Sequence, residues 1–200
     1  LIFNVYVVRQ LGATHYGRYA AALAYVSIFG MFTDLGTSTL SVREMARHES
    51  NIARMTTNVM ALRAILSLGA IVVISGSAWL LGKTPDMVLG ILIGSCSLLL
   101  YAYYGPLECV IVSRERLDIS SILQVLNQFV FIVLGTMLLL AGAGYIGLLS
   151  ASLGGVIAMG IVATFATRRL WGLGLQAPDS KQWKPLLKAS APFAWTGILG

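Results

Sequence analysis

The chain has 200 residues, of which 57% are hydrophobic and only 11% are charged, and its mean hydropathy is +0.80. A soluble domain carries about 25% charged residues, so folding in water would leave apolar surface without a polar coat, and a soluble globular protein is excluded. The net charge of +6 does not call for a nucleic-acid partner, because basic loops beside anionic membrane lipids account for it.

Three stretches without Asp, Glu, Lys, Arg or His, at 64–82, 87–107 and 119–167, predict membrane-spanning segments. The last has 49 residues. As a single helix it would extend roughly 74 Å, more than twice the thickness of a bilayer core of about 30 Å. It must therefore fold back, and the small residues Ala141-Gly142-Ala143-Gly144 are the predicted turn.

The predicted fold class is all-α, a polytopic bundle of transmembrane helices. In chain order we expect a partial helix at 1–11, then helices at 17–41, 57–82, 87–112, 118–141 and 145–168, and a second partial helix beginning near 187. The chain opens with Leu1 in an apolar segment, and the apolar stretch 189–200 is too short to span a bilayer. We therefore expect the chain to be truncated inside a helix at both ends.

The distribution of the 14 Lys and Arg residues predicts the orientation. Three of them, Arg9, Arg18 and Lys83, fall on one side of the predicted bundle, and the rest fall on the side of 42–56, 113–117 and 169–186. Cytoplasmic loops carry the excess of basic residues, so these three loops are predicted to face the cytoplasm from a plasma (inner) membrane. The longest, 169–186, fits either a linker between two helical bundles or an ordinary interfacial loop.

A few polar side chains fall inside the predicted spans, roughly 9–13 Å from the basic ends of their helices. They are Asp34, Arg63, Glu108, Gln124, Asn127 and Gln128. Ionisable groups in a membrane are costly and are usually functional or paired. Their common depth fits a water-accessible cavity for a polar substrate, but it also fits polar contacts between helices, such as an Asp34–Arg63 ion pair.

Enzyme and metal chemistry are disfavoured by the motifs. His15 and His48 lie apart in predicted loops, and the sequence contains no phosphate-binding loop, nucleophile elbow or paired carboxylates. Cys96 and Cys109 have no metal-ligand spacing and are predicted to serve in packing. We therefore expect no metal, no cofactor and no catalytic residue.

Two motifs carry a resemblance to a known family. The segment from Val8 to Tyr19 contains Leu11-Gly12 and Tyr16-Gly17, and Asp34-Leu35-Gly36 follows it. Together with 105–116 and 188–192, these resemble polysaccharide and oligosaccharide flippases of the Wzx type, in the multidrug/oligosaccharidyl-lipid/polysaccharide (MOP) exporter superfamily. The resemblance implies a MATE-like fold of two six-helix lobes around a central cavity. Residues 1–168 would form lobe one, 169–186 the cytoplasmic interlobe linker, and 187–200 the start of lobe two.

The resemblance also implies a function. Such proteins move polyprenyl-diphosphate-linked oligosaccharides from the inner to the outer leaflet by alternating access, driven by a coupling ion such as a proton or sodium. Here Arg9 or Arg63 would attract the diphosphate, Asp34 or Glu108 would take up protons, and the amides would bind sugar hydroxyls. The amides are Gln124, Asn127 and Gln128.

Three alternatives stay open. A drug or cation antiporter of the same superfamily would place acidic residues in its cavity. A non-transporting membrane scaffold would use the polar residues only as interhelical contacts. The membrane part of a glycan-processing protein would carry a large polar domain elsewhere. In each case membrane lipids surround the helices, and a lipid-linked glycan is the partner expected from the resemblance.

Overall fold

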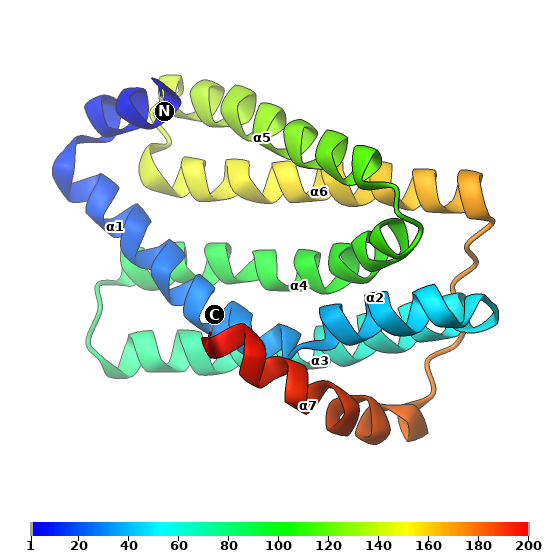
Figure 1. Cartoon of the computed structure of the whole chain (residues 1–200). Coiled ribbons are helices and arrows are strands. Elements are labelled where there is room, and N and C mark those ends of the chain that lie inside the picture. The colour runs from blue at the N-terminus through cyan, green and yellow to red at the C-terminus, as the bar shows by residue number, and fades with distance from the viewer. Residues whose placement is uncertain (1, 200) are drawn as a thin grey trace.

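The fold is a bundle of α-helices, shown in Figure 1 as a computed structural model. The structure describes the backbone of residues 2–199 and the side chains of residues 3, 5–49 and 51–193. Within this part of the chain there is no β-strand, which confirms the predicted all-α class. The predicted chain ends at Leu1 and Gly200 lie outside the described residues.

The described part of the chain holds seven α-helices and two short 3-10 helices. They are α1 (Ile2–Asp34), α2 (Thr37–Arg47), η1 (Glu49–Asn51), α3 (Ile52–Leu80), α4 (Pro85–Ser113), α5 (Leu117–Leu140), α6 (Gly144–Trp171), η2 (Ser180–Gln182) and α7 (Trp183–Leu199). The helices α3, α4, α5 and α6 are long and apolar enough to cross a membrane, and α1 with α2 adds a fifth span bent by 41°. The chain is therefore a multi-pass membrane protein.

The first difference from the prediction concerns the helix expected at 17–41. The helix α1 already runs from Ile2, with one break at Gly12, where φ is 70° and ψ is 167°. It ends at Asp34, because Leu35 (φ 45°) and Gly36 (φ 72°) take left-handed conformations. The prediction of one continuous helix from 17 to 41 is thus wrong, and the chain bends instead where Asp34-Leu35-Gly36 occurs.

The second difference concerns the loop expected at 42–56. Most of it is helical, since α2 continues to Arg47 and α3 begins at Ile52. The physical reason is that α2 is amphipathic: Leu40 and Met45 are buried while Arg43 and Arg47 are exposed. The charges therefore mark the polar face of a helix and not the predicted loop. Similarly, α6 extends to Trp171 and α7 begins at Trp183, so the connection is shorter than the predicted 169–186.

The long helices form a row that α1 crosses (Figure 1). The helix α5 packs against α6, α6 against α4, and α4 against α3, while α1 contacts α3, α4 and α6. Glycines permit close approach at some of these crossings. At Gly90 of α4, a Cβ atom would lie 2.8 Å from the ring of Tyr145 on α6, so the absence of a side chain at Gly90 lets the Tyr145 ring pack directly on α4.

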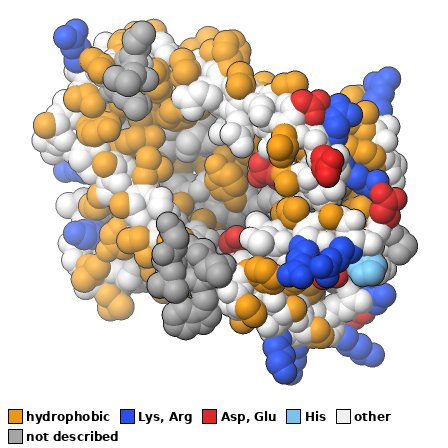
Figure 2. All heavy atoms as spheres, in the orientation of Figure 1, with side chains coloured by type: hydrophobic (Ala, Val, Ile, Leu, Met, Phe, Trp, Pro, Cys, Tyr) orange, Lys and Arg blue, Asp and Glu red, His pale blue; other side chains and the backbone are white. Residues whose placement is uncertain are grey.

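The connections separate into two ends, as Figure 1 shows. The α2–α3, α4–α5 and α6–α7 connections lie together at one end, called here the basic end. Ion pairs join them, since Arg54 pairs with Asp179 at 2.8 Å and Arg114 pairs with Glu49. Charged side chains gather over this end in Figure 2, whereas the rest of the visible face is mostly apolar.

Candidate functional site

Arg63 is the twelfth residue of α3 and is only 6% exposed. Its Nε donates a hydrogen bond to Thr37 Oγ1 at 2.8 Å, and a terminal nitrogen donates to Ser38 Oγ at 2.8 Å. The same nitrogen forms an ion pair with Asp34. The Asp34–Arg63 pair expected from the sequence is therefore present, and Thr37 and Ser38 complete the partners of the guanidinium.

This Arg63 cluster spans the break between α1 and α2. Asp34 ends α1, and its carboxylate accepts hydrogen bonds from Ser38 N at 3.0 Å and from Thr37 Oγ1 at 3.1 Å. The carboxylate therefore caps the start of α2 by satisfying one of its free N–H groups. Because Arg63 contacts residues on both sides of Leu35-Gly36, it fixes the bend between the two helices.

A glycine on α4 makes space for the guanidinium. A Cβ atom at Gly105 would lie 2.5 Å from Arg63 Nη1, so a larger residue at 105 would push Arg63 out of place. The cluster is not sealed, because 41% of the Asp34 side chain is exposed. One member of the ion pair thus remains accessible from outside the packed bundle.

A second polar group joins α4 and α5. Ser120 Oγ donates a hydrogen bond to Glu108 Oε1 at 3.0 Å, and Glu108 is partly buried. Tyr101 lies seven residues before Glu108, hence on the same face of α4, and is 45% exposed. Neither Ser120 nor Tyr101 was predicted as a site residue, although the spacing of seven could have pointed to Tyr101.

A polar stripe on α5 continues from Ser120. Gln124 and Gln128 follow at intervals of four residues, so all three share one face of the helix. Further along this face Phe131 packs edge-on against Phe3 of α1, with ring centroids 5.4 Å apart. Between these two contacts, the side chains of Gln124 and Gln128 are exposed.

The opposite face of α5 is apolar and exposed, as a lipid-facing surface should be. Ile122, Val125 and Phe129 are 65%, 69% and 64% exposed. The glutamines therefore lie on a different side of α5 from these apolar residues. Figure 2 shows that the visible face of the molecule is hollowed near its middle.

Two of the predicted site residues lie elsewhere. Asn127 packs at the α5–α6 contact, where its side-chain oxygen leaves no room for a Cβ atom at Gly155. Arg9 is exposed, three residues before the break at Gly12, and among the described side chains no hydrogen bond or ion pair joins it to the other candidates. Among the described residues, no group of three His, Cys, Asp or Glu side chains could hold a metal ion.

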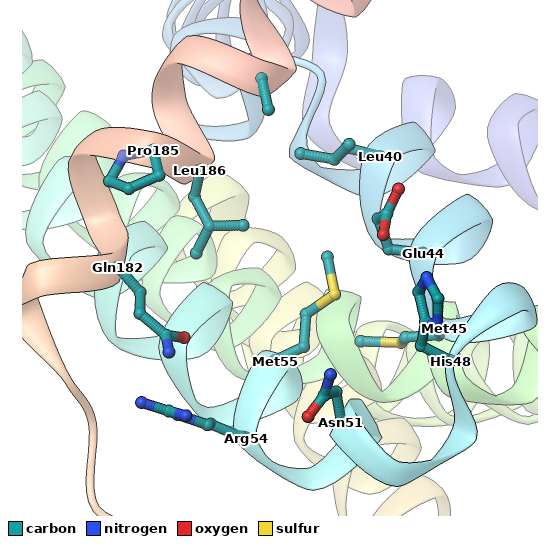
Figure 3. Close-up of a pocket in the computed structure, with 11 residues that line it drawn as sticks. Leu40, Glu44, Met45, His48, Asn51, Arg54, Met55, Gln182, Pro185 and Leu186 are labelled. Carbon is teal, nitrogen blue, oxygen red and sulfur yellow. The ribbon is translucent and has the colours of Figure 1, made fainter.

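A cavity of about 360 Å³ lies at the basic end between α2, α3 and α7. Figure 3 shows apolar side chains, such as Met55 and Leu186, and polar ones, such as Glu44, His48 and Arg54, pointing toward it. The sequence did not predict this cavity, because it depends on how α7 returns to α2. Its mixture of groups suggests no specific ligand.

The α6–α7 connection is held against α3 by Asn58, which is fully buried. Asn58 Oδ1 accepts a hydrogen bond from Asp179 N at 2.7 Å, and Asn58 Nδ2 donates to Gln182 Oε1 at 2.9 Å. Thr57 Oγ1 accepts from Gln176 N at 3.1 Å. Residues 176–182 are therefore attached to the first turns of α3.

Replacing Arg63 by alanine should destabilise the protein by roughly 3 kcal/mol, because Asp34 loses its partner and the bend loses its link. We expect the melting temperature in detergent to fall by several degrees. Gly105→Ala should produce a smaller fall by displacing the guanidinium, whereas Gly76→Ala, which would meet no atom within 4 Å, should not. Equal melting temperatures for wild type and the Arg63→Ala variant would show that the cluster is not structural.

Comparison with known proteins now identifies the family. A family model described as polysaccharide biosynthesis protein matches residues 1–200, which is the whole chain. No curated protein and no solved structure matches the chain. The chain thus belongs to the polysaccharide biosynthesis protein family, the family of Wzx-type polysaccharide flippases in the MOP superfamily.

Proposed function

We propose that this chain is part of an inner-membrane transporter that flips a polyprenyl-diphosphate-linked oligosaccharide to the outer leaflet by alternating access. It is proposed to be a carrier and not an enzyme. Family membership supports the class of substrate. The observation that carries the proposal is the pair of exposed amides, Gln124 and Gln128, one and two turns after the buried Ser120, whose hydroxyl is hydrogen bonded to Glu108.

Exposed amides are informative in a membrane protein. An amide that faces hydrocarbon without a partner costs several kcal/mol, so Gln124 and Gln128 need water or a polar ligand beside them. Each amide has both donors and acceptors, which matches the hydroxyl groups of a sugar. The lipid-facing side of α5 has apolar residues at the same depth. This contrast supports a hydrated path for the glycan along one face of α5.

The contacts of Arg63 argue against a direct role in binding the diphosphate. Its Nε and one terminal nitrogen are already hydrogen bonded, and the side chain is 6% exposed. We assign Arg63 to holding the α1–α2 bend. We propose that exposed cations, including Arg9, and residues of the second lobe bind the diphosphate instead. Asn127 is likewise assigned to packing.

Between the two candidate acids, Glu108 is the better coupling group. Protonating Asp34 would leave the buried guanidinium of Arg63 without its counter-charge, which is costly. Glu108 instead has a hydroxyl partner, Ser120, and can take up a proton without leaving a charge unpaired. We therefore propose proton coupling through Glu108, with sodium as the alternative ion.

The placement of the linker completes the proposal. We propose that the basic end faces the cytoplasm, that residues 172–182 are the interlobe linker, and that α7 is the first helix of lobe two. The contacts of Asn58 with Asp179 and Gln182 support a linker that moves with lobe one. The junction between η2 and α7 would then take up the relative motion of the lobes.

The polar stripe can be tested with a matched pair of neighbours on α5. In the full-length transporter, Gln128→Leu should lower the flipping rate roughly tenfold, as expected for one or two lost hydrogen bonds of ~1 kcal/mol each. Phe129→Leu, on the lipid-facing side, should leave the rate within twofold. The measurement is appearance of labelled lipid-linked oligosaccharide in the lumen of everted vesicles, normalised to protein abundance. Equal rates for both variants, or export of a cationic dye only, would reject the proposal.

The coupling role of Glu108 predicts a change in pH dependence. Glu108→Gln should remove the stimulation of flipping by a proton gradient, because a neutral amide cannot take up the proton. Glu115→Gln, at an exposed acid beside the basic end, should retain it. Asp34→Asn should instead lower protein abundance. If the Glu108→Gln variant still responds fully to the gradient, another residue carries the proton, or the coupling ion is different.

A further inference from the structure

A groove of about 470 Å³ lies between α4 and α6. Its walls are largely apolar, and one basic residue stands at its end. The residues used here are Leu100, Val156, Ile157, Ile161, Phe165 and Arg168. We propose that this groove binds an anionic phospholipid, with one acyl chain against the apolar wall and the phosphate beside Arg168.

The two hydroxyl groups at the floor of the groove, those of Tyr103 and Thr164, already have hydrogen-bond partners within the protein and need none from a ligand. Thr164 Oγ1 donates a hydrogen bond to Gly160 O at 2.7 Å, so it accepts from the hydroxyl of Tyr103, also at 2.7 Å. Gly160 adds depth, because it places no side chain beneath the Tyr103 ring, whose nearest atom would be 3.7 Å from a Cβ there. An apolar chain fits such a floor better than a sugar does.

The length of the groove matches one leaflet. From Val156 to Arg168 the helix α6 rises by roughly 18 Å, close to half of a bilayer core of about 30 Å. A chain lying along this stretch would thus place its headgroup at the membrane surface, where Arg168 is exposed. This agreement of length and charge selects a lipid over a soluble ligand.

Charge complementarity selects an anionic headgroup. Arg168 is exposed at the last turn of α6, and no carboxylate forms an ion pair with it among the described side chains. The neighbouring Arg169 is engaged, since its guanidinium lies 5.5 Å from the centroid of the Phe165 ring. Arg168 is therefore the cation that lines the groove and has no partner carboxylate among the described side chains, and a guanidinium pairs well with phosphate oxygens.

The groove lies away from the face proposed for the glycan. Leu98 of α4 faces α1, where it meets Gly30, and Tyr103 follows about 140° further around the helix. The helix α7, which leads toward the rest of the chain, packs against α2 and α3 and not along this groove. The residues that line the groove come from α4 and α6 and not from α5, so the phospholipid site is separate from the polar stripe of α5.

The test uses photoactivatable phosphatidylglycerol and phosphatidylcholine, each with a diazirine on one acyl chain, in proteoliposomes of the full-length transporter. Adducts on the peptide around 156–168 are counted by mass spectrometry. Phosphatidylglycerol should give at least five times more adduct than phosphatidylcholine. Arg168→Ala should reduce the phosphatidylglycerol adduct at least fivefold, whereas Arg168→Lys should reduce it less than twofold.

Two matched controls separate the groove from its surroundings. Gly160→Leu should block labelling, whereas Gly160→Ala, which makes only ordinary contact with Tyr103, should not. Arg47→Ala removes an exposed cation on α2 and should leave labelling unchanged. If the Gly160→Leu variant does not fold, the comparison of Arg168→Ala with Arg168→Lys alone tests the proposal. Equal labelling by both lipids, unchanged labelling of Arg168→Ala, or displacement of the probe by polyprenyl phosphate but not by phosphatidylglycerol would overturn the proposal.

Discussion

The architecture around the site depends on the pairing of one buried guanidinium, that of Arg63, because the membrane interior contains no water to solvate its charge. A charge in the bilayer interior costs several kcal/mol unless it is paired, and Arg63 is 6% exposed. Its partners, Asp34, Thr37 and Ser38, all come from the bend between α1 and α2. Arg63 therefore sets the angle at which α2 leaves the bundle. The cavity at the basic end, in Figure 3, follows from that angle and from the return of α7 to α2.

Much of the fold could be predicted because the bilayer imposes it. The charge-free stretches predicted the helices α3 to α6. The glycines after residue 140 predicted the turn between α5 and α6, where Gly142 has a φ of 78°. The bend after Asp34 could not be predicted, since Leu35 has a positive φ that its side chain disfavours and that only tertiary contacts stabilise. Treating the charges of α2 as a loop failed for a different reason. An amphipathic helix carries the same composition as a loop, and only the alternation of Leu40 and Met45 with Arg43 and Arg47 separates the two.

The site was predictable in its residue types and not in its groupings. The common depth of Asp34, Arg63, Glu108 and the amides in the predicted spans identified them as candidate site residues. Depth does not specify which face of a helix a residue lies on. Asn127 lies seven residues after Ser120 and packs against Gly155 of α6, whereas Gln124 and Gln128 lie about 40° and 80° further around α5 and are exposed. The helical period gives these angles, yet the side of α5 that packs against its neighbours became clear only from the contacts of Ser120, Asn127 and Phe131. The structure confirms the polar contact between helices for Asp34 and Arg63, and a water-accessible cavity beside Gln124 and Gln128 stays a prediction.

The central claim is that water, and not lipid, lies against one face of α5. It is tested most directly by single cysteines at positions 124, 125, 128 and 129 in full-length protein in which Cys96 and Cys109 are replaced by serine. A charged, membrane-impermeant thiol reagent is added to everted vesicles, and the labelling rates are compared. Cysteines at 124 and 128 should react at least tenfold faster than those at 125 and 129, because the thiolate is the reactive species and forms only where water is present. Equal rates at all four positions, or no reaction at 124 and 128, would contradict the account.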